Sequence, residues 1–197
     1  MIIGLMGGSG SGKGAACKIF TTLGGYCIDA DKTAHLLMKR GNKCYAEIVD
    51  FFGTEILSED GEINRAILGP IVFSDKEKLK RLNEITHKHI REEIKNDILK
   101  NKDKYKFIVV DAPLLVESGL DKAADTVCLI YADTKKRIER IMQRDNISEE
   151  KARLRIKNQM SHEEERLYAS SLIENNGSLE ELEEKIKKYI KDLNIDD

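Results

Sequence analysis

The sequence from Gly7 to Gly14 reads Gly-Gly-Ser-Gly-Ser-Gly-Lys-Gly, and these residue types are suited to binding a phosphate group. Glycines allow successive backbone N–H groups to turn toward an anion, because no Cβ blocks the approach or the positive φ angles. An apolar run, Met1 to Met6, precedes the stretch and a helical run, Ala15 to Phe20, follows it. When a strand, a glycine loop and a helix follow one another in this order, the positive end of the helix dipole faces the same anion as the loop N–H groups. Lys13 adds a mobile cation. The stretch is therefore a candidate phosphate-binding loop, or P-loop.

The residues of this loop that we expect to contact a nucleotide are Gly8, Gly10, Ser11, Gly12, Lys13, Gly14 and Ala15. The pattern G-x-x-x-x-G-K-[ST] is complete from Gly7 through Lys13, but Gly14 stands where a hydroxyl normally binds the Mg²⁺ of the nucleotide. Ser11 is a poor substitute, since it precedes the lysine and should point elsewhere. The alternative is a flexible glycine-rich turn that happens to contain a lysine. The flanking strand and helix favour the P-loop.

Two carboxylates, Asp29 and Asp31, follow a short β-prone run at residues 26–28. In an extended backbone, residues two apart project to the same side, so both side chains point one way at the carboxyl end of the strand. Ligands bind at that edge in open α/β sheets. Asp31 also precedes a helical run, residues 32–37, and an aspartate there is a good N-cap. Capping is compatible with catalysis, and by itself it leaves Asp29 unexplained.

A second acidic strand end is Asp111, which follows the apolar run Phe107 to Val110. In P-loop proteins a carboxylate at this place holds the Mg²⁺ shell through water. The alternative is a buried strand whose last residue happens to be acidic. Further along, Arg137, Arg140 and Arg144 share one helix face at spacings of three and four. An arginine cluster beside a P-loop balances the charge of a transferring phosphoryl group, although for Arg137 we favour an ordinary surface position.

A third set of polar residues lies on a long helix, which we expect to begin at a capping box of Ser74 with Glu77. Glu84, His87 and Arg91 fall at three- and four-residue spacing on one face of this helix. A solvated polar face is the default interpretation of such a stripe, and a ligand contact is the alternative.

The composition limits the class of protein. The chain has 197 residues, enough to bury a sizeable core, and we expect one domain with an insertion or two. A net charge of −2, from 33 basic and 35 acidic residues, gives no global field that indicates nucleic acid or an anionic membrane. Cys17, Cys27, Cys44 and Cys128 have no metal-ligand spacing, so we interpret them as small buried hydrophobes. With no leader-like or membrane-spanning stretch, a reduced, cytosolic compartment is the default expectation.

Strands and helices alternate along the sequence, which predicts an α/β fold with a parallel sheet, helices on both faces and right-handed crossovers. About five strands are expected, at residues 1–6, 26–28, 107–111, 126–131 and 172–174. Later helices are expected to begin near Asp133 and Thr134, at Ser148, at a capping box of Ser161 with Glu164, and at Ser178 with Glu181.

A P-loop alone leaves open a small-molecule kinase, a GTPase-like switch, or a nucleotide-binding module that acts on other proteins. Guanine-reading switches use an Asn-Lys-x-Asp stretch. The nearest approach, residues 101–104, lacks the final carboxylate and precedes a strand instead of following one. A kinase needs a carboxylate that activates the acceptor, an arginine-bearing lid and an insertion that holds the acceptor. The sequence offers all three.

The chain resembles the dephospho-coenzyme A kinase family from end to end. The matching stretches are Gly4–Leu5, Gly7 through Lys13, Asp29–Asp31 with Ala34–His35, Gly61 with Asn64–Arg65 and Val72–Phe73, Ile85–His87, Pro113–Leu115 with Glu117–Gly119, Arg140 with Gln143–Asp145, and Ile173 with Asn175–Gly177. Many families share the P-loop, whereas the Asp-Ala-Asp and Pro-Leu-Leu-x-Glu elements at these separations are much more specific.

The resemblance implies that ATP, with Mg²⁺, donates its γ-phosphate to the ribose 3′-hydroxyl of dephospho-coenzyme A, the last step in making coenzyme A. It implies that Asp31 accepts the hydroxyl proton, while Lys13 and Arg140 stabilise the transferring phosphoryl group. The implied nucleotide site also includes Arg144, and the implied acceptor site comprises Asp29, Asp31, Arg65, His87, Pro113, Leu114 and Glu117. A proline usually follows the histidine in this family. Lys88 stands there in this chain, so we expect the local backbone to differ.

The implied fold is that of the P-loop NTPases. Its nucleotide-binding core would comprise residues 1–31, 104–144 and 168–197, with a helical acceptor-binding insertion at 32–103 and a helical lid at 145–167. We expect a cytoplasmic monomer or weak homo-oligomer that binds neither nucleic acid nor membrane. Two alternatives remain open: another P-loop kinase, such as a nucleoside monophosphate kinase, and a catalytically weakened nucleotide-binding module, which Gly14 would explain.

Overall fold

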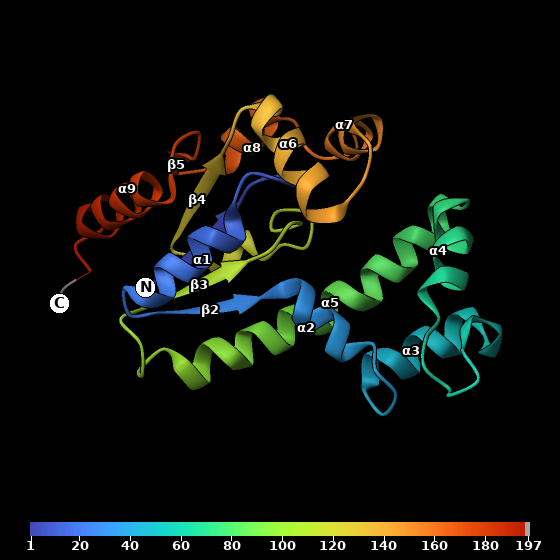
Figure 1. The fold of residues 1–197 in the computed structure, drawn as a ribbon. Coiled ribbons are helices and arrows are strands. Elements are labelled where there is room, and N and C mark those ends of the chain that lie inside the picture. The colour runs from blue at the N-terminus through green and yellow to red at the C-terminus, as the bar shows by residue number, and fades with distance from the viewer. Residues whose placement is uncertain (196–197) are drawn as a thin grey trace. The chain divides into compact units, whose positions relative to one another are not determined.

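A parallel sheet organises one of two compact units. The computed structural model describes residues 1–195. Within them the sheet has five strands, in the order β2-β3-β1-β4-β5: β1 (Ile2–Met6), β2 (Gly25–Asp29), β3 (Phe107–Asp111), β4 (Thr126–Tyr131) and β5 (Ser171–Glu174). Every neighbouring pair of strands is parallel (Figure 1). The predicted α/β class and parallel sheet are confirmed.

The middle strands are almost continuously apolar because both faces of the sheet are covered. In β3, Phe107 through Val110 are each at most 2% exposed. All the strands end at one edge because they are parallel, and the register places both Leu5 and Asp29 beside Asp111. The acidic ends of β2 and β3 therefore lie together at the edge where the P-loop leaves β1.

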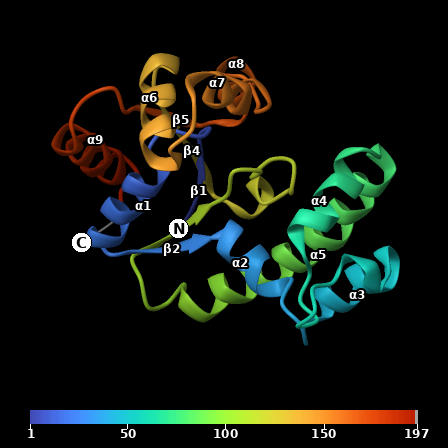
Figure 2. The same ribbon diagram turned by 45° about the vertical axis from the view of Figure 1, so that its right-hand side comes forward.

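One face of the sheet packs against α1 (Lys13–Thr22) and α9 (Leu179–Asp192), which lie side by side (Figures 1 and 2). The ring of Phe20 meets Phe107 and Tyr189 edge-on, at centroid distances of 6.0 and 6.3 Å. The rest of this buried cluster includes Ile3, Leu5, Ala16, Ile19, Val109, Ile130, Leu182 and Ile186. On the other face, a Cβ at Gly4 would meet Leu115 Cδ2 at 2.8 Å, so the loop after β3 packs closely on β1. Packing on both faces fixes the start of α1, and with it the backbone of Lys13.

Residues 30–97 form the second compact unit, which is helical. Its elements are α2 (Ala30–Leu37), α3 (Lys43–Phe52), the short 3₁₀ helix η1 (Thr54–Ile56), α4 (Arg65–Phe73) and most of α5 (Lys76–Asn101). The unit has a core of its own, made by Cys44, Ile48, Phe52, Ile56, Leu68, Val72 and Ile85. Most of the predicted insertion lies here, and its role in binding an acceptor stays a prediction.

The helices between β4 and β5 are α6 (Thr134–Asp145), α7 (Glu149–Lys157) and α8 (His162–Tyr168), and the short 3₁₀ helix η2 (Asp121–Ala123) precedes β4. Helices α6 and α7 share a small apolar core of Ile138, Ile141 and Ala152. Ser148 and Ser178 cap their helices as predicted, and Ser161 with Glu164 forms the predicted capping box. Among the described residues, no helix is both long and apolar enough to cross a bilayer.

Two predicted helix starts are wrong. Ser74 closes α4, and the next helix is capped by Asp75, whose Oδ1 accepts from the N–H groups of Glu77 and Lys78 at 2.9 and 3.1 Å. An aspartate N-cap competes well with a serine one residue earlier, because its carboxylate also favours the positive end of the helix dipole. Helix α2 begins at Ala30, so Asp31 lies in its first turn and is not the N-cap.

Candidate active site

The P-loop joins β1 to α1, and its glycines are required by its shape. Gly10 and Gly12 have φ angles of 79° and 99°, in the left-handed region that other residues avoid. A Cβ at Gly12 would also collide with the side-chain amide of Asn175. Helix α1 begins as the Ala15 and Ala16 N–H groups donate to Gly12 O, each at 3.0 Å. The loop therefore leads into the positive end of a ten-residue helix, as phosphate binding requires.

Lys13 forms an ion pair with Asp111, the last residue of β3, with Nζ to Oδ1 at 3.5 Å. The two side chains are only 13% and 18% exposed, so water screens this pair less than a surface pair. Asp29 is the register partner of Asp111 on β2. The sheet edge thus holds the P-loop lysine between its own loop and the acidic end of β3.

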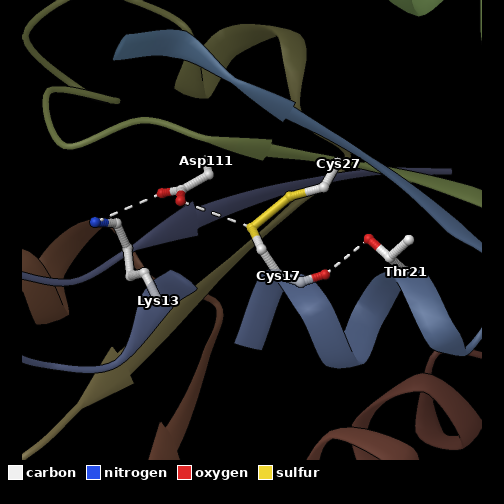
Figure 3. Close-up of a disulfide and its surroundings, with 5 residues drawn as sticks. All are labelled: Lys13, Cys17, Thr21, Cys27 and Asp111. Atoms are coloured by element: carbon white, nitrogen blue, oxygen red, sulfur yellow. Dashed lines mark hydrogen bonds and ion pairs between the residues drawn. A yellow bond between two sulfur atoms is a disulfide. The ribbon is translucent and has the colours of Figure 1, made fainter. Parts of the chain in front are cut away.

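Cys17 and Cys27 are joined by a disulfide that links α1 to β2 (Figure 3). Cys17 Sγ also lies 3.7 Å from Asp111 Oδ2. The interpretation of all four cysteines as small buried hydrophobes is therefore wrong for this pair, because the packing of α1 on the sheet brings the two sulfurs together. It holds for Cys44 and Cys128, where burial raises the thiol pKa to about 11 and about 12.

Arg140 contacts the P-loop through the loop's backbone carbonyls. Its Nη1 donates to Gly10 O at 3.3 Å and Ser11 O at 3.4 Å, and its Nη2 donates to Asn175 O at 3.0 Å. Asn175, buried at the end of β5, donates from Nδ2 to Ser11 O at 2.8 Å. Arg140 and Asn175 therefore hold the loop through the carbonyl groups of Gly10 and Ser11. The contact of Arg140 with a phosphoryl group stays a prediction.

The other two arginines of the α6 series behave differently from each other. Arg137 is only 7% exposed and donates from Nε to Ser9 O at 2.9 Å, so the predicted surface position is wrong. Its guanidinium lies against the P-loop, as the bond to Ser9 shows, and burial lowers the pKa of Arg137. Arg144 is exposed and binds Asp145 with two hydrogen bonds, at 2.8 and 2.9 Å. With Arg155 also bonded to that carboxylate, the pKa of Asp145 falls to about 2.

The comparisons with known proteins agree with this geometry. A protein-family model described as dephospho-CoA kinase matches residues 1–181. The chain belongs to the dephospho-CoA kinase family. A relative from Aquifex aeolicus named dephospho-CoA kinase is 41% identical over 194 residues, covering 98% of both chains. Two solved structures each align over 98% of this chain. The structure from Thermus thermophilus is 32% identical, with a TM-score of 0.84 and 97% of its own chain covered. A dephospho-CoA kinase from Campylobacter jejuni is 31% identical, with a TM-score of 0.70 and 96% of its own chain covered.

The residues that the family resemblance assigns to the acceptor site are divided between the two compact units. Pro113, Leu114 and Glu117 lie in a loop after β3 that exposes all three and is anchored by the buried Leu115. In the helical unit, Arg65 is the first residue of α4, whose N-cap Asn64 accepts from the Ala66 N–H at 2.9 Å. The assignment of these residues to the acceptor site stays a prediction.

The departure from the family pattern at Lys88 leaves helix α5 unbroken. Lys88 Nζ pairs with Glu47 of α3 at 3.2 Å, and the buried His89 contacts the same carboxylate at 3.0 Å. His87, the predicted ligand, is only partly buried on the same helix. Lysine, unlike proline, keeps the backbone N–H that a continuous helix needs, and here it also ties α5 to α3.

Sequence reasoning missed four residues around the P-loop: Arg137, Gln159, Glu165 and Asn175. Arg137 belonged to the arginine series and Asn175 to the family motif, so both carried a signal that we did not use. Gln159 and Glu165 lie in a polar segment with no pattern of its own. Glu165 on α8 is 8% exposed, and burial raises its pKa to about 6, although the charges of Arg137 and Lys13 lower it. The nearby Glu117 raises it further.

Glu165→Gln is expected to stabilise the protein above pH 6 and not below pH 4.5. The folded state raises the pKa of this carboxyl from 4.5 to about 6, so its contribution to stability is fully present below 4.5 and is lost as pH rises through 6. The loss amounts to at most roughly 2 kcal/mol, and a glutamine does not titrate. Thermal unfolding of both proteins from pH 4.5 to 8 measures the widening gap.

The matched control is Glu163→Gln, which removes an exposed carboxylate from the same helix. Its melting temperature should track that of the unaltered protein across this range. A gap between Glu165→Gln and the unaltered protein that is the same at every pH would contradict the prediction.

Proposed function

We propose that this chain transfers the γ-phosphate of ATP to the ribose 3′-hydroxyl of dephospho-CoA, with Asp31 as the base that accepts the hydroxyl proton. Membership of the family is the observation that carries the reaction. The ion pair of Lys13 with Asp111 at the mouth of the P-loop, with Asp29 beside it on β2, supports the assignment of the transfer site to this edge.

The nucleotide is proposed to bind at the P-loop residues Gly8, Gly10, Ser11, Gly12, Lys13, Gly14 and Ala15, with Lys13 following charge onto the outer phosphates. Arg140 acts on the same loop from its outer side, and in our proposal it also compensates charge on the transferring group, with Arg144 at the rim. Residues 145–167 are proposed to close over ATP, which excludes water and protects the triphosphate from hydrolysis.

The acceptor is proposed to bind in contact with the carboxylates Asp29 and Asp31. The proposed acceptor contacts also include the exposed loop residues Pro113, Leu114 and Glu117, together with Arg65 and His87 of the helical unit. Asp31 is exposed in the first turn of α2, two residues beyond the end of β2, so a bound acceptor can reach its carboxylate from solvent.

When bound with ATP, Mg²⁺ would supply positive charge that neutralises the phosphate oxygens. Within the described residues, no group of three or more His, Cys, Asp or Glu side chains is placed to hold a metal. The donor set nevertheless suits Mg²⁺, which usually takes one or two carboxylates, several waters and substrate phosphates. We infer that Asp111, with Asp29 or Asp31, supplies the protein's share, since Gly14 has no hydroxyl to offer.

A coupled assay that detects ADP tests the reaction. With ATP and Mg²⁺, dephospho-CoA is expected to give sustained ADP formation and a product with one more phosphate by mass. AMP, CMP and shikimate at the same concentration should give at least about 100-fold lower kcat/KM, because unmatched polar groups in a site cost that much. Equal turnover of a nucleoside monophosphate would assign the chain a different acceptor.

A further inference from the structure

Ser9, in the middle of the P-loop, has every one of its polar groups bonded by two side chains from later in the sequence. Its N–H donates to Gln159 Oε1 at 2.9 Å, and its hydroxyl Oγ accepts from Gln159 Nε2, also at 2.9 Å. Its carbonyl accepts from Arg137 Nε at 2.9 Å. Arg137 Nη2 closes the ring by donating to Gln159 Oε1 at 3.1 Å.

The glycines on either side of Ser9 lie too close to Arg137 and Gln159 to carry a side chain. A Cβ at Gly8 would collide with the guanidinium of Arg137 and approach Gln159 Oε1 to 3.0 Å. A Cβ at Gly10 would come within 2.9 Å of the Arg137 Cα. Residues Gly8 to Gly10 therefore pack directly against Arg137, through its side chain and its backbone, and Gly8 also packs against the Gln159 side chain.

Gln159 comes from the junction between α7 and α8, inside the predicted lid. It follows Asn158, the C-cap of α7, and precedes the capping box of Ser161 that begins α8. Glu165, further along α8, is buried and lies within the electrostatic reach of Arg137 and Lys13. A change in the position of the α7–α8 junction therefore cannot leave Ser9 undisturbed.

We propose that Gln159 is a positioning residue that holds the P-loop in its phosphate-binding shape and couples that shape to helices α7 and α8. Gln159 does not touch the nucleotide. It fixes Ser9, and through Ser9 it fixes the direction of the loop N–H groups on either side. With Gln159 in place, the segment that excludes water and the loop that binds phosphate move together.

The proposal rests on the proposed use of ATP, so its test measures ATP affinity directly, with no acceptor present. Gln159→Ala is expected to raise the Kd for ATP, and the KM for ATP in the assay, by about tenfold, the loss that follows from removing such hydrogen bonds. Its kcat should stay within about threefold of the unaltered enzyme. ADP formation without acceptor, relative to ADP formation with dephospho-CoA, should rise several-fold because water enters more freely.

Conservative variants separate positioning from general stability. Gln159→Glu keeps an oxygen that accepts from Ser9 N–H and from Arg137, and the Ser9 hydroxyl can rotate to donate to it, so ATP affinity should recover to within about threefold. Gln159→Met fills the same volume without hydrogen bonds and should behave as Gln159→Ala does. Asn158→Ala, at the adjacent exposed position, is the matched control and should bind ATP normally.

Unchanged ATP affinity in Gln159→Ala and Gln159→Met would overturn the proposal, and so would a lowered melting temperature with normal affinity. If Gln159→Ala fails to fold, Ser9→Ala decides the question, because it deletes one bond of the ring and leaves Gln159 in place. About threefold weaker ATP binding supports the proposal, and normal binding refutes it. A failure to phosphorylate dephospho-CoA would leave these ATP measurements interpretable and would count against the proposed reaction alone.

Discussion

Asp31→Asn is expected to lower kcat for dephospho-CoA phosphorylation by about 10²- to 10⁴-fold, the range that a general base contributes. Asparagine has nearly the same shape but cannot take the proton of the 3′-hydroxyl. Asp31 is exposed in the first turn of α2, so the variant should fold, with a stability loss of about 0.3–1 kcal/mol from the helix dipole. The Kd for ATP, measured without acceptor, should change by less than about threefold.

Asp29→Asn is the matched control, since it removes a carboxylate two residues away at the end of β2. The loss of kcat in Asp29→Asn should be at least about tenfold smaller than the loss in Asp31→Asn, because Asp29 is not the proposed base. Unchanged turnover in Asp31→Asn would remove Asp31 from that role. Equal losses in the two variants would mean that the carboxylates act together on the metal or the acceptor.

The second large effect is expected at Asp111→Asn, which should lower kcat about 100-fold, as the loss of one preorganised charge does at an active site. It should also raise the Mg²⁺ concentration for half-maximal rate by about 10- to 100-fold, the usual cost of losing an outer partner of a metal. The Lys13 pair at 3.5 Å is lost as well. Asp111→Asn could act through the metal or through Lys13. If only the lysine contact were weakened, the KM for ATP would rise even at saturating Mg²⁺, so this measurement separates the two causes.

Whereas Asp111→Asn removes a proposed partner of the metal, Gly14→Ser adds a hydroxyl that could bind it. Outside its chain neighbours and the backbone of its own helix, a Cβ at Gly14 meets no atom within 4 Å, so there is room for a side chain to begin there. The serine hydroxyl should lower the Mg²⁺ requirement a few-fold, both in the unaltered chain and in Asp111→Asn. Gly14→Ala adds the same Cβ without the oxygen and is the control. Identical Mg²⁺ curves for the serine and alanine variants would contradict the idea that this loop lacks a metal ligand.

The features that could be predicted from the sequence were those with local causes. The P-loop, the strands ending in Asp29 and Asp111, and the serine caps at Ser161 and Ser178 all follow from short-range spacing, and the structure confirms these elements. The parallel sheet followed from the alternation of strands and helices. The start of α5 was missed because two adjacent residues were both capable caps, and only the backbone geometry decides between Ser74 and Asp75.

The contacts that shape the loop could not be predicted, because they join residues far apart in the sequence. Gln159 meets Ser9 across 150 positions, and Asn175 meets Ser11 across 164. Arg137 was misread because a guanidinium on an amphipathic helix is usually solvated, and its burial depends on Ser9 accepting a hydrogen bond from it. The disulfide of Cys17 with Cys27 likewise depends on how α1 lies against β2. No spacing rule contains that information.

The central position of β1 has a consequence for how the chain acquires its activity during synthesis. This strand precedes the other four in the sequence, and the two strands beside it follow more than a hundred residues later: Ile2 pairs with Ile108, and Ile3 with Thr126. Residues 30–97 have a core of their own and need no later segment to complete it. Domains fold largely in the order of their synthesis, and distant strand pairing is slow. The helical unit can therefore form its core before the strands that flank β1 have been made, and Asn175, which bonds to the phosphate-binding loop, follows the last strand of the sheet.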